Sequence, residues 1–307
     1  MENTGHHDQP KANRTFKASI FEMIFSDKNR LLELYNAVNG TDYKDPDLLK
    51  VNTLKNAIYM AVRNDISFVI GSRMSLYEHQ STYSENLTLR FLFYVSDLFS
   101  SITRDINLYG RKGVKLPAPR FLIFYNGEEE MEERKILRLS DLYSQREENP
   151  ALELEAVMLN INQGHNQKLL DDCRTLKDYA EYTARVRKYA KGMELDDAVE
   201  RAITECIREG ILADFLKKNR SEAKKVSIYE YDAEKHIRME REDAMAEGLE
   251  KGIALGTERG RRETLQRQIE KKRRKGLNAA EIAEILEEEE ETIKEIMEKM
   301  EKEEILV

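Results

Sequence analysis

Two acids and an amide are the residues of this chain best placed to do chemistry: Asp65, Glu78 and Gln80. An apolar run at 66–70, a glycine-containing turn and a returning run predict two antiparallel strands between them. Because side chains two apart on a strand share a face, Glu78 and Gln80 project together, and Asp65 can join them. Carboxylate and amide oxygens suit Mg²⁺ or Mn²⁺ better than zinc.

The same acids also have a purely structural interpretation. Asp65 can cap a turn and Glu78 can be an exposed strand residue, because acidic residues are common near hairpins. His79 points to the opposite face of the predicted strand, where a structural or edge role is favoured over that of a general base. The hairpin pattern alone leaves both interpretations open.

Composition indicates one compact domain with a solvated appendage. The chain has 307 residues, of which 40% are apolar and 35% charged, and its mean hydropathy is −0.67. Cys173 and Cys206 lie far apart and no apolar leader precedes them, so we expect a cytoplasmic protein with reduced thiols. No run of eighteen apolar residues occurs, so we expect no membrane partner.

Charge is unevenly distributed. The formal net charge of −8 argues against indiscriminate nucleic-acid binding. Two basic clusters stand against this background, one in the connection 104–120 and one at 271–275. The first cluster consists of Arg104, Arg111, Lys112, Lys115 and Arg120. Each cluster either meets a phosphate backbone or is a solvated loop or helix face.

Hydrophobic periodicity predicts a mixed α/β core followed by helices. A helix or a broken pair of helices is expected from Phe16 to Asn39, ending at Gly40. The other core elements are a strand-rich block at 51–82, a helix at 87–106, and strands at 120–125 and 152–161. Pro117 to Pro119 reads as a stiff connector. Helices are expected at 178–193 and 196–218, the second capped by Asp196.

The C-terminal tail is highly charged and punctuated by glycine. Gly248, Gly252, Gly256 and Gly260 recur every fourth residue, and each costs a helix ~1 kcal/mol relative to alanine. This predicts a segment that is weakly helical by itself, ordered by a partner or serving as a flexible arm. Asn278 can then cap a last helical stretch that is similar to the start of a helix-turn-helix. The acidic residues 287–291 make it a poor DNA reader, so an assembly helix is favoured.

Five ordered motifs carry a family resemblance over roughly the first two thirds of the chain. They are FKASIFEMIFSDKNRLLELYNAVNGTDY, NDISFVIGSRMSLYEHQST, NLTLRFLFYVSDLF, RFLIFYNG and LNINQGHN. In this order they resemble the Rpn-type recombination-promoting nucleases, also called PD-(D/E)xK family transposases, and the glycine-punctuated tail looks similar to that family's C-terminal extension. The resemblance implies a PD-(D/E)xK restriction-endonuclease-like core, a mixed sheet flanked by helices, with an all-helical extension.

The resemblance also implies domains and site roles. It divides the chain into a disordered lead-in at 1–13, the nuclease-like core at 14–168, a helical segment at 169–232 and the tail at 233–307. Asp65 and Glu78 would bind Mg²⁺ or Mn²⁺, with the backbone carbonyl of His79 as a further ligand. Gln80 replaces the family's usual lysine and would position water, since glutamine can neither carry charge nor act as a base.

The implied activity is metal-dependent cleavage of DNA, linked to recombination or a mobile element. Lys17, Arg111, Lys112 and Lys115 would contact the DNA. The acidic residue that the family often has just before the Phe-Lys pair is missing here, and Glu22 could substitute for it. The alternative is a catalytically degenerate nuclease fold that binds or regulates, self-associating as a homo-oligomer through its helical tail. The acidic balance and the change to Gln80 favour that alternative.

Overall fold

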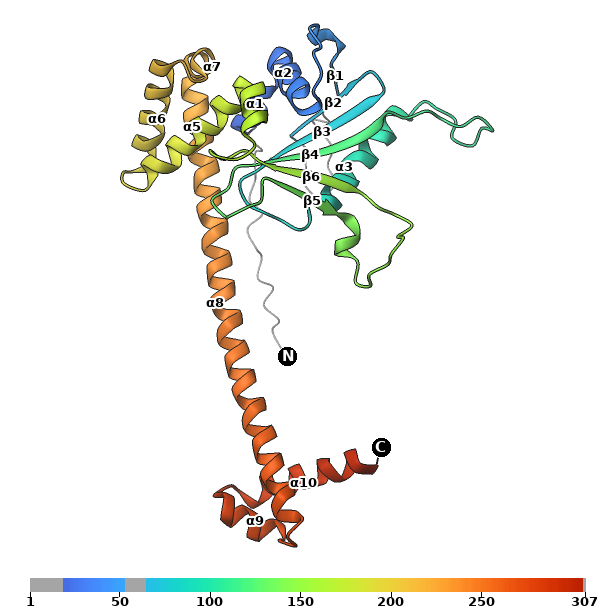
Figure 1. Cartoon of the computed structure of the whole chain (residues 1–307), viewed down its shortest axis with the longest axis vertical. Helices are drawn as coiled ribbons and strands as arrows, with labels where there is room; N and C mark the ends of the chain where they lie inside the picture. The colour runs from blue at the N-terminus through green and yellow to red at the C-terminus, as the bar shows by residue number, and fades with distance from the viewer. Residues whose placement is uncertain (1–18, 53–64, 306–307) are drawn as a thin grey trace, which may run out of the picture. The chain divides into compact units, whose positions relative to one another are not determined.

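The computed structural model describes residues 19–52 and 65–305, and within them six strands form one mixed sheet (Figure 1). The strands are β1 (Lys50–Val51), β2 (Ile66–Ile70), β3 (Arg73–Gln80), β4 (Ala118–Tyr125), β5 (Arg134–Arg138) and β6 (Glu155–Asn160). Their order in the sheet is β1-β2-β3-β4-β6-β5. β3, β4 and β6 run parallel, whereas the remaining neighbours pair antiparallel.

Helices surround this sheet and form the C-terminal part of the chain. They are α1 (Ile20–Phe25), α2 (Lys28–Asn39), α3 (Leu87–Ile102), α4 (Gln167–Asp172), α5 (Arg174–Ala190), α6 (Leu195–Glu209), α7 (Ala213–Lys218), α8 (Arg220–Arg273), α9 (Ala279–Leu286) and α10 (Glu290–Ile305). Short 3-10 turns, η1 (Pro46–Leu48) and η2 (Leu139–Leu142), complete the elements. The chain divides into two compact units at Glu234, so that α8 belongs to both. The predicted mixed α/β class with a helical C-terminal extension is confirmed.

The first predicted helix is a pair, and local capping explains the break. Ser19 accepts a hydrogen bond from the backbone of Glu22 and begins α1. Asp27 accepts two backbone hydrogen bonds and begins α2. Gly40 ends α2 with a φ of 62°, a left-handed conformation that glycine adopts without a Cβ clash. The predicted C-cap at Gly40 is confirmed.

Side chains from both faces of the sheet are buried, which explains the nearly continuous apolar strands. On one face, Phe68, Tyr77 and Phe124 lie in a core that includes α1, α2 and α5. On the other face, Leu76 and Ile123 lie in a second core, with α3. Neighbouring residues of β3 therefore enter different cores, and the same alternation separates His79 from Glu78.

Several element boundaries differ from the sequence predictions. β4 begins at Ala118, inside the predicted connector, where it pairs with Arg73 of β3. β5 was not predicted, because a charged edge strand lacks apolar alternation. The predicted helix at 196–218 is divided by Gly210, which has a φ of 83° and caps α6. Asp196 lies in the first turn of α6 rather than at its cap, and pairs with Lys224 at 2.7 Å.

The four glycines of the tail lie within α8, which is a continuous helix of 54 residues. The predicted helical tail is confirmed, and of its two alternatives the flexible arm differs from this continuous helix. The start of α8 is packed in the first unit through buried Ala223 and Val226. This packing nucleates the helix, and extending a formed helix costs less than forming its first turn. Farther along, α9 begins with a capping box between Asn278 and Glu281, as the predicted cap requires. Among the helices that the structure describes, none could span a membrane.

Candidate functional site

The β2–β3 hairpin brings together the three residues that the sequence singled out. Ile66 pairs with Tyr77, so Asp65 and Glu78 lie across from one another at the end of the hairpin. The backbone N–H of Asp65 donates to Glu78 Oε2 over 3.4 Å. On the same face of β3, Gln80 Nε2 donates to Glu78 Oε1 over 3.3 Å. Asp65, Glu78 and Gln80 therefore form one hydrogen-bonded cluster.

Glu78 is buried, with 2% of its surface exposed. The alternative interpretation as an exposed strand residue is wrong. Arg90 of α3 donates to Glu78 Oε1 over 2.5 Å and also lies 3.3 Å from the hydroxyl of Tyr94. Arg90 is not among the predicted site residues; its signal is a single arginine inside the otherwise apolar run LTLRFLFYV.

Burial, and to a smaller extent the negative charge of Glu22, raise the pKa of Asp65 from 3.8 to about 7. The backbone N–H of His79, which donates to Asp65 Oδ2 over 2.7 Å, and the charge of Arg90 lower this pKa in part. Glu22, in the first turn of α1, is thus close enough to act on Asp65. The site carries more negative charge than its cations offset, which favours capture of a further cation.

The chemistry of this donor set fits a hard divalent ion. Asp65 and Glu78 supply carboxylate oxygens, and the amide of Gln80 adds a neutral oxygen. Mg²⁺ is commonly held by one or two carboxylates and retains several waters. Within residues 19–52 and 65–305, no group of three or more His, Cys, Asp or Glu side chains is placed to hold a metal. Any ion here would depend on two carboxylates, with Glu78 shared with Arg90.

His79 faces away from this cluster and serves the opposite core. Its Nε2 lies 2.8 Å from Asn126 Oδ1 and 2.9 Å from the hydroxyl of Tyr179, and its ring stacks on Phe21. Burial, and to a smaller extent the charge of Arg187, lower the pKa of His79 to about 4. The imidazole is therefore neutral at pH 7 and structural, as the strand alternation predicted.

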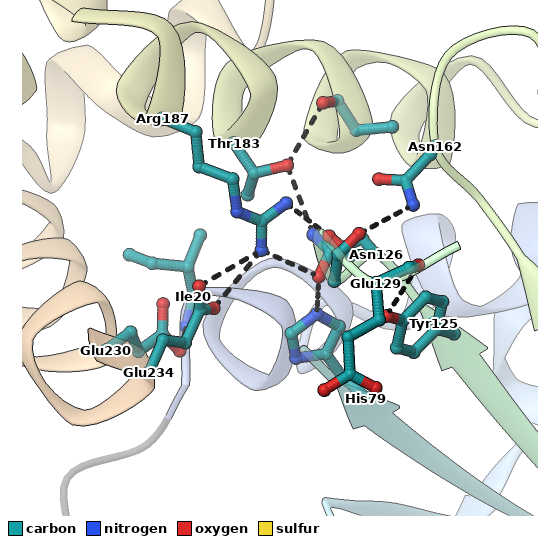
Figure 2. Close-up of polar contacts among 12 residues, drawn as sticks. Ile20, His79, Tyr125, Asn126, Glu129, Asn162, Thr183, Arg187, Glu230 and Glu234 are labelled. Atoms are coloured by element: carbon teal, nitrogen blue, oxygen red, sulfur yellow. Dashed lines mark hydrogen bonds and ion pairs between the residues drawn. The ribbon is translucent and has the colours of Figure 1, made fainter. Parts of the chain in front are cut away.

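Asn126 is the centre of a polar network that links the strand ends to α5 and α8 (Figure 2). It donates to Thr183 over 3.1 Å, and its backbone carbonyl accepts from Arg187. Arg187 also pairs with Glu234 of α8 at 3.2 Å. No spacing in the sequence links Asn126 to Arg187, because only the packing of α5 against β4 brings the two together.

A second acid from α8 reaches α1 beside this network. Glu230 Oε1 accepts from the backbone N–H of Ile20 over 3.1 Å. Burial, and to a smaller extent the nearby acids Glu234 and Asp65, raise the pKa of Glu230 from 4.5 to about 8. Glu230 is therefore coupled electrostatically to the candidate site, although it lies on the opposite face of β3 from Glu78.

Three of the predicted DNA contacts lie in the described residues, on a loop separate from this cluster. Arg111, Lys112 and Lys115 are exposed on the loop between α3 and β4. Lys17 lies outside the described residues, as do the lead-in at 1–13 and part of the predicted strand block. The basic run 271–275 forms the last three residues of α8, which ends at Arg273, and the two residues after it.

Comparison with known proteins yields no relative from which to transfer a function. No protein-family model, curated protein or solved structure matches this chain. The candidate site therefore rests on its own geometry and on the resemblance of the sequence motifs.

Proposed function

We propose that this protein is a metal-dependent DNA endonuclease of the PD-(D/E)xK type, linked to recombination or a mobile element. The observation that carries the proposal is the cluster of Asp65 and Gln80 around the buried Glu78 at the end of a hairpin, where acidic charge exceeds basic charge. A hairpin followed by α3 and a parallel β4 agrees with the core that the motif resemblance implies. The link to recombination rests on that resemblance alone.

Each residue of the cluster has a distinct part in the proposed reaction. Asp65 and Glu78 would hold the ion, and Arg90 fixes the Glu78 carboxylate in place through its 2.5 Å hydrogen bond. A bound Mg²⁺ would supply Lewis-acid polarisation of a phosphoryl oxygen and an acidified water. Gln80 would orient an attacking water by a hydrogen bond. The exposed loop with Arg111, Lys112 and Lys115 contacts the phosphate backbone, and this supplies affinity without sequence readout.

A second candidate function has its own observation. Arg90 already offsets the charge of Glu78, and the described part of the chain contains no metal-holding group of three acidic, histidine or cysteine side chains. This arrangement favours a catalytically degenerate fold that binds or regulates through its helical tail. The two functions differ in whether the cluster captures a divalent ion.

Plasmid cleavage tests the proposal. Supercoiled DNA is incubated with the full chain and Mg²⁺, Mn²⁺ or Ca²⁺, beside Asp65→Asn and Glu78→Gln. An exposed acid on the β3–α3 connection provides the matched control Glu85→Gln. We expect cleavage with Mg²⁺ or Mn²⁺ that falls at least about 100-fold in both site variants and is unchanged in Glu85→Gln.

Binding of Mn²⁺, measured by calorimetry on the same proteins, separates the two functions. Ion binding and cleavage that both disappear in the site variants support the nuclease. Equal nicking by all proteins indicates a contaminant and removes the support for an enzyme. Absence of both ion binding and cleavage in the unmodified chain overturns the nuclease and leaves the binding protein.

A further inference from the structure

The loop between α3 and β4, residues 103–117, carries the two most exposed large apolar side chains of the first unit. Tyr109 is 100% exposed and Leu108 61%. No other large apolar side chain in residues 19–52 or 65–234 is more than 52% exposed. Apolar surface that the fold leaves in water at adjacent positions is typical of an interaction site. We call Leu108 and Tyr109 the apolar tip.

Local hydrogen bonds hold the apolar tip in a turn. The backbone N–H of Tyr109 donates to Asn107 Oδ1 over 3.0 Å, and that of Gly110 donates to the backbone oxygen of Asn107 over 3.3 Å. An asparagine side chain that accepts from the backbone two residues later forms a turn of its own. The segment that joins α3 to β4 extends away from the sheet (Figure 1). The apolar tip is therefore a convex projection with a defined backbone conformation.

Cations flank the apolar tip on both sides. Arg104 precedes it, Arg111, Lys112 and Lys115 follow it, and Asp105 is the only acid of the loop. All four cations are exposed, and none of them forms an ion pair within the part of the chain that the structure describes. Four cations against one acid leave the loop positive in a chain whose formal net charge is −8. This charge selects a polyanion as the partner of the loop.

The loop joins the sheet at the end opposite the acidic cluster. Ala118, which follows the loop, pairs with Arg73 at the start of β3, whereas Glu78 lies five residues farther along this strand. At about 3.3 Å per residue, these two positions on β3 are about 17 Å apart. DNA rises about 3.4 Å per base pair, so a duplex that reaches both contacts spans at least about five base pairs. A contact at the apolar tip is thus separate from the bond that the cluster would cleave.

We propose that the apolar tip inserts between two base pairs of duplex DNA, while the flanking cations hold the phosphates on either side. The choice of DNA rests on the proposed function. A convex projection fits a groove of the duplex, and apolar side chains placed between base pairs unstack them and kink the helix. The flat ring of Tyr109 is amphipathic and suits this position. The preferred substrate is then DNA that unstacks easily at a step at least about five base pairs from the cut, such as a pyrimidine–purine step or a bulge.

Binding to matched and bulged duplexes tests the insertion. Fluorescence anisotropy is measured with EDTA present, so that binding requires neither a metal ion nor cleavage. A duplex with a one-base bulge has already lost part of its stacking, and we expect the full chain to bind it at least about tenfold more tightly than the matched duplex. Leu108→Ser with Tyr109→Ser should remove this preference, whereas Leu108→Met with Tyr109→Phe keeps an apolar tip and should retain it. Arg111→Gln with Lys112→Gln is the matched control, and should weaken binding to both duplexes equally and lower the salt dependence by about two phosphate contacts.

Energy transfer between dyes at the two ends of the matched duplex tests the kink. The full chain and the methionine–phenylalanine variant should shorten the end-to-end distance, and the serine variant at saturating concentration should not; circular dichroism checks that each variant is folded. Equal affinity for the two duplexes, a serine variant that keeps the preference, or a duplex that stays straight overturns the insertion, whatever the cleavage assay gives. Insertion without cleavage supports this inference and overturns the nuclease alone. Binding to vesicles of anionic phospholipid and not to DNA, lost in the serine variant, assigns the apolar tip to a membrane and also overturns the proposal.

Discussion

Arg90 of α3 and Glu78 of β3 form an ion pair of 2.5 Å in which the carboxylate is almost entirely buried. The arginine is half-buried and also contacts Tyr94. A carboxylate removed from water needs a charged or hydrogen-bonded partner, since the desolvation cost of a lone buried ion is several kcal/mol. The pair therefore holds the acidic cluster together whether or not a metal ion is bound.

Replacement of Arg90 by methionine should destabilise the fold strongly. The variant Arg90→Met keeps much of the side-chain volume but removes the charge beside Glu78, and we expect a loss of about 3–5 kcal/mol in the free energy of unfolding. Urea denaturation measures it. Arg138→Met is the matched control, because Arg138 pairs with Glu155 at 2.8 Å in solvent, and should lose no more than about 1 kcal/mol. Equal losses would contradict the assigned role of the Arg90 pair.

Glu230 should make stability depend on pH in a defined direction. Its pKa of about 8 in the folded chain lies above the ordinary 4.5, so the folded state holds a proton that the unfolded state releases between these values. This stabilisation is complete below pH 4.5 and is lost as the pH rises through 8. Glu230→Gln keeps the oxygen that accepts from Ile20 and removes the titration. The unmodified chain should lose this stabilisation between pH 5 and pH 8, whereas Glu230→Gln should not. The free energy of unfolding of Glu230→Gln minus that of the unmodified chain should therefore increase from pH 5 to pH 8.

Denaturation at both pH values measures this difference. Glu222→Gln, an exposed change on the same helix, controls for the loss of one negative charge. The contribution of His79, whose lowered pKa acts in the opposite direction between pH 4 and 6.5, is present in all three proteins and cancels. A difference for Glu230→Gln that does not change with pH would show that Glu230 is ionised in the folded state.

Gly127 should not tolerate a side chain. A Cβ at this position would lie 2.1 Å from the backbone oxygen of Ser81 and 2.4 Å from the hydroxyl of Tyr125. We expect Gly127→Ala to lower the free energy of unfolding by at least about 1–3 kcal/mol, because strand ends must move apart. Gly113→Ala, where a Cβ meets no atom within 4 Å, should change it by no more than about 0.5 kcal/mol. Thermal unfolding of the two variants gives the comparison, and similar melting temperatures would refute it.

Gln80→Lys tests one of the two departures from the usual nuclease pattern. If the proposed function holds, a lysine beside Glu78 can carry the charge that glutamine lacks, and plasmid cleavage should increase by about tenfold or more. Gln80→Glu, which adds charge of the opposite sign, is the control and should cleave more slowly than the unmodified chain. A Gln80→Lys protein that binds Mn²⁺ but cleaves no faster would show that Gln80 does not limit the reaction.

Local sequence signals determined much of the scaffold. Strand alternation placed Glu78 and Gln80 on one face and His79 on the other, and the structure has the same arrangement. Gly40 and Asn278 were identified as helix caps from residue type and position alone. These features depend on contacts within a few residues, so periodicity and capping chemistry are enough to predict them.

The glycines of the tail do not interrupt its helix. Each of the four glycines lowers intrinsic helix propensity, yet α8 continues through all of them. Propensity is a local term, and the helix is already nucleated by Ala223 and Val226 in the core of the first unit. A long-range packing contact thus decided a conformation that the local composition argued against.

Tertiary structure alone decided what surrounds the acidic cluster. Arg90 reaches Glu78 from α3, Glu22 acts on Asp65 from α1, and Glu230 approaches from α8. These elements are separated by up to about two thirds of the chain, and no periodicity encodes which side chains meet when they pack. The sequence alone determined the strand that presents the carboxylates, whereas the burial, the charge balance and the raised pKa of Asp65 exist only because the helices exclude water from that strand.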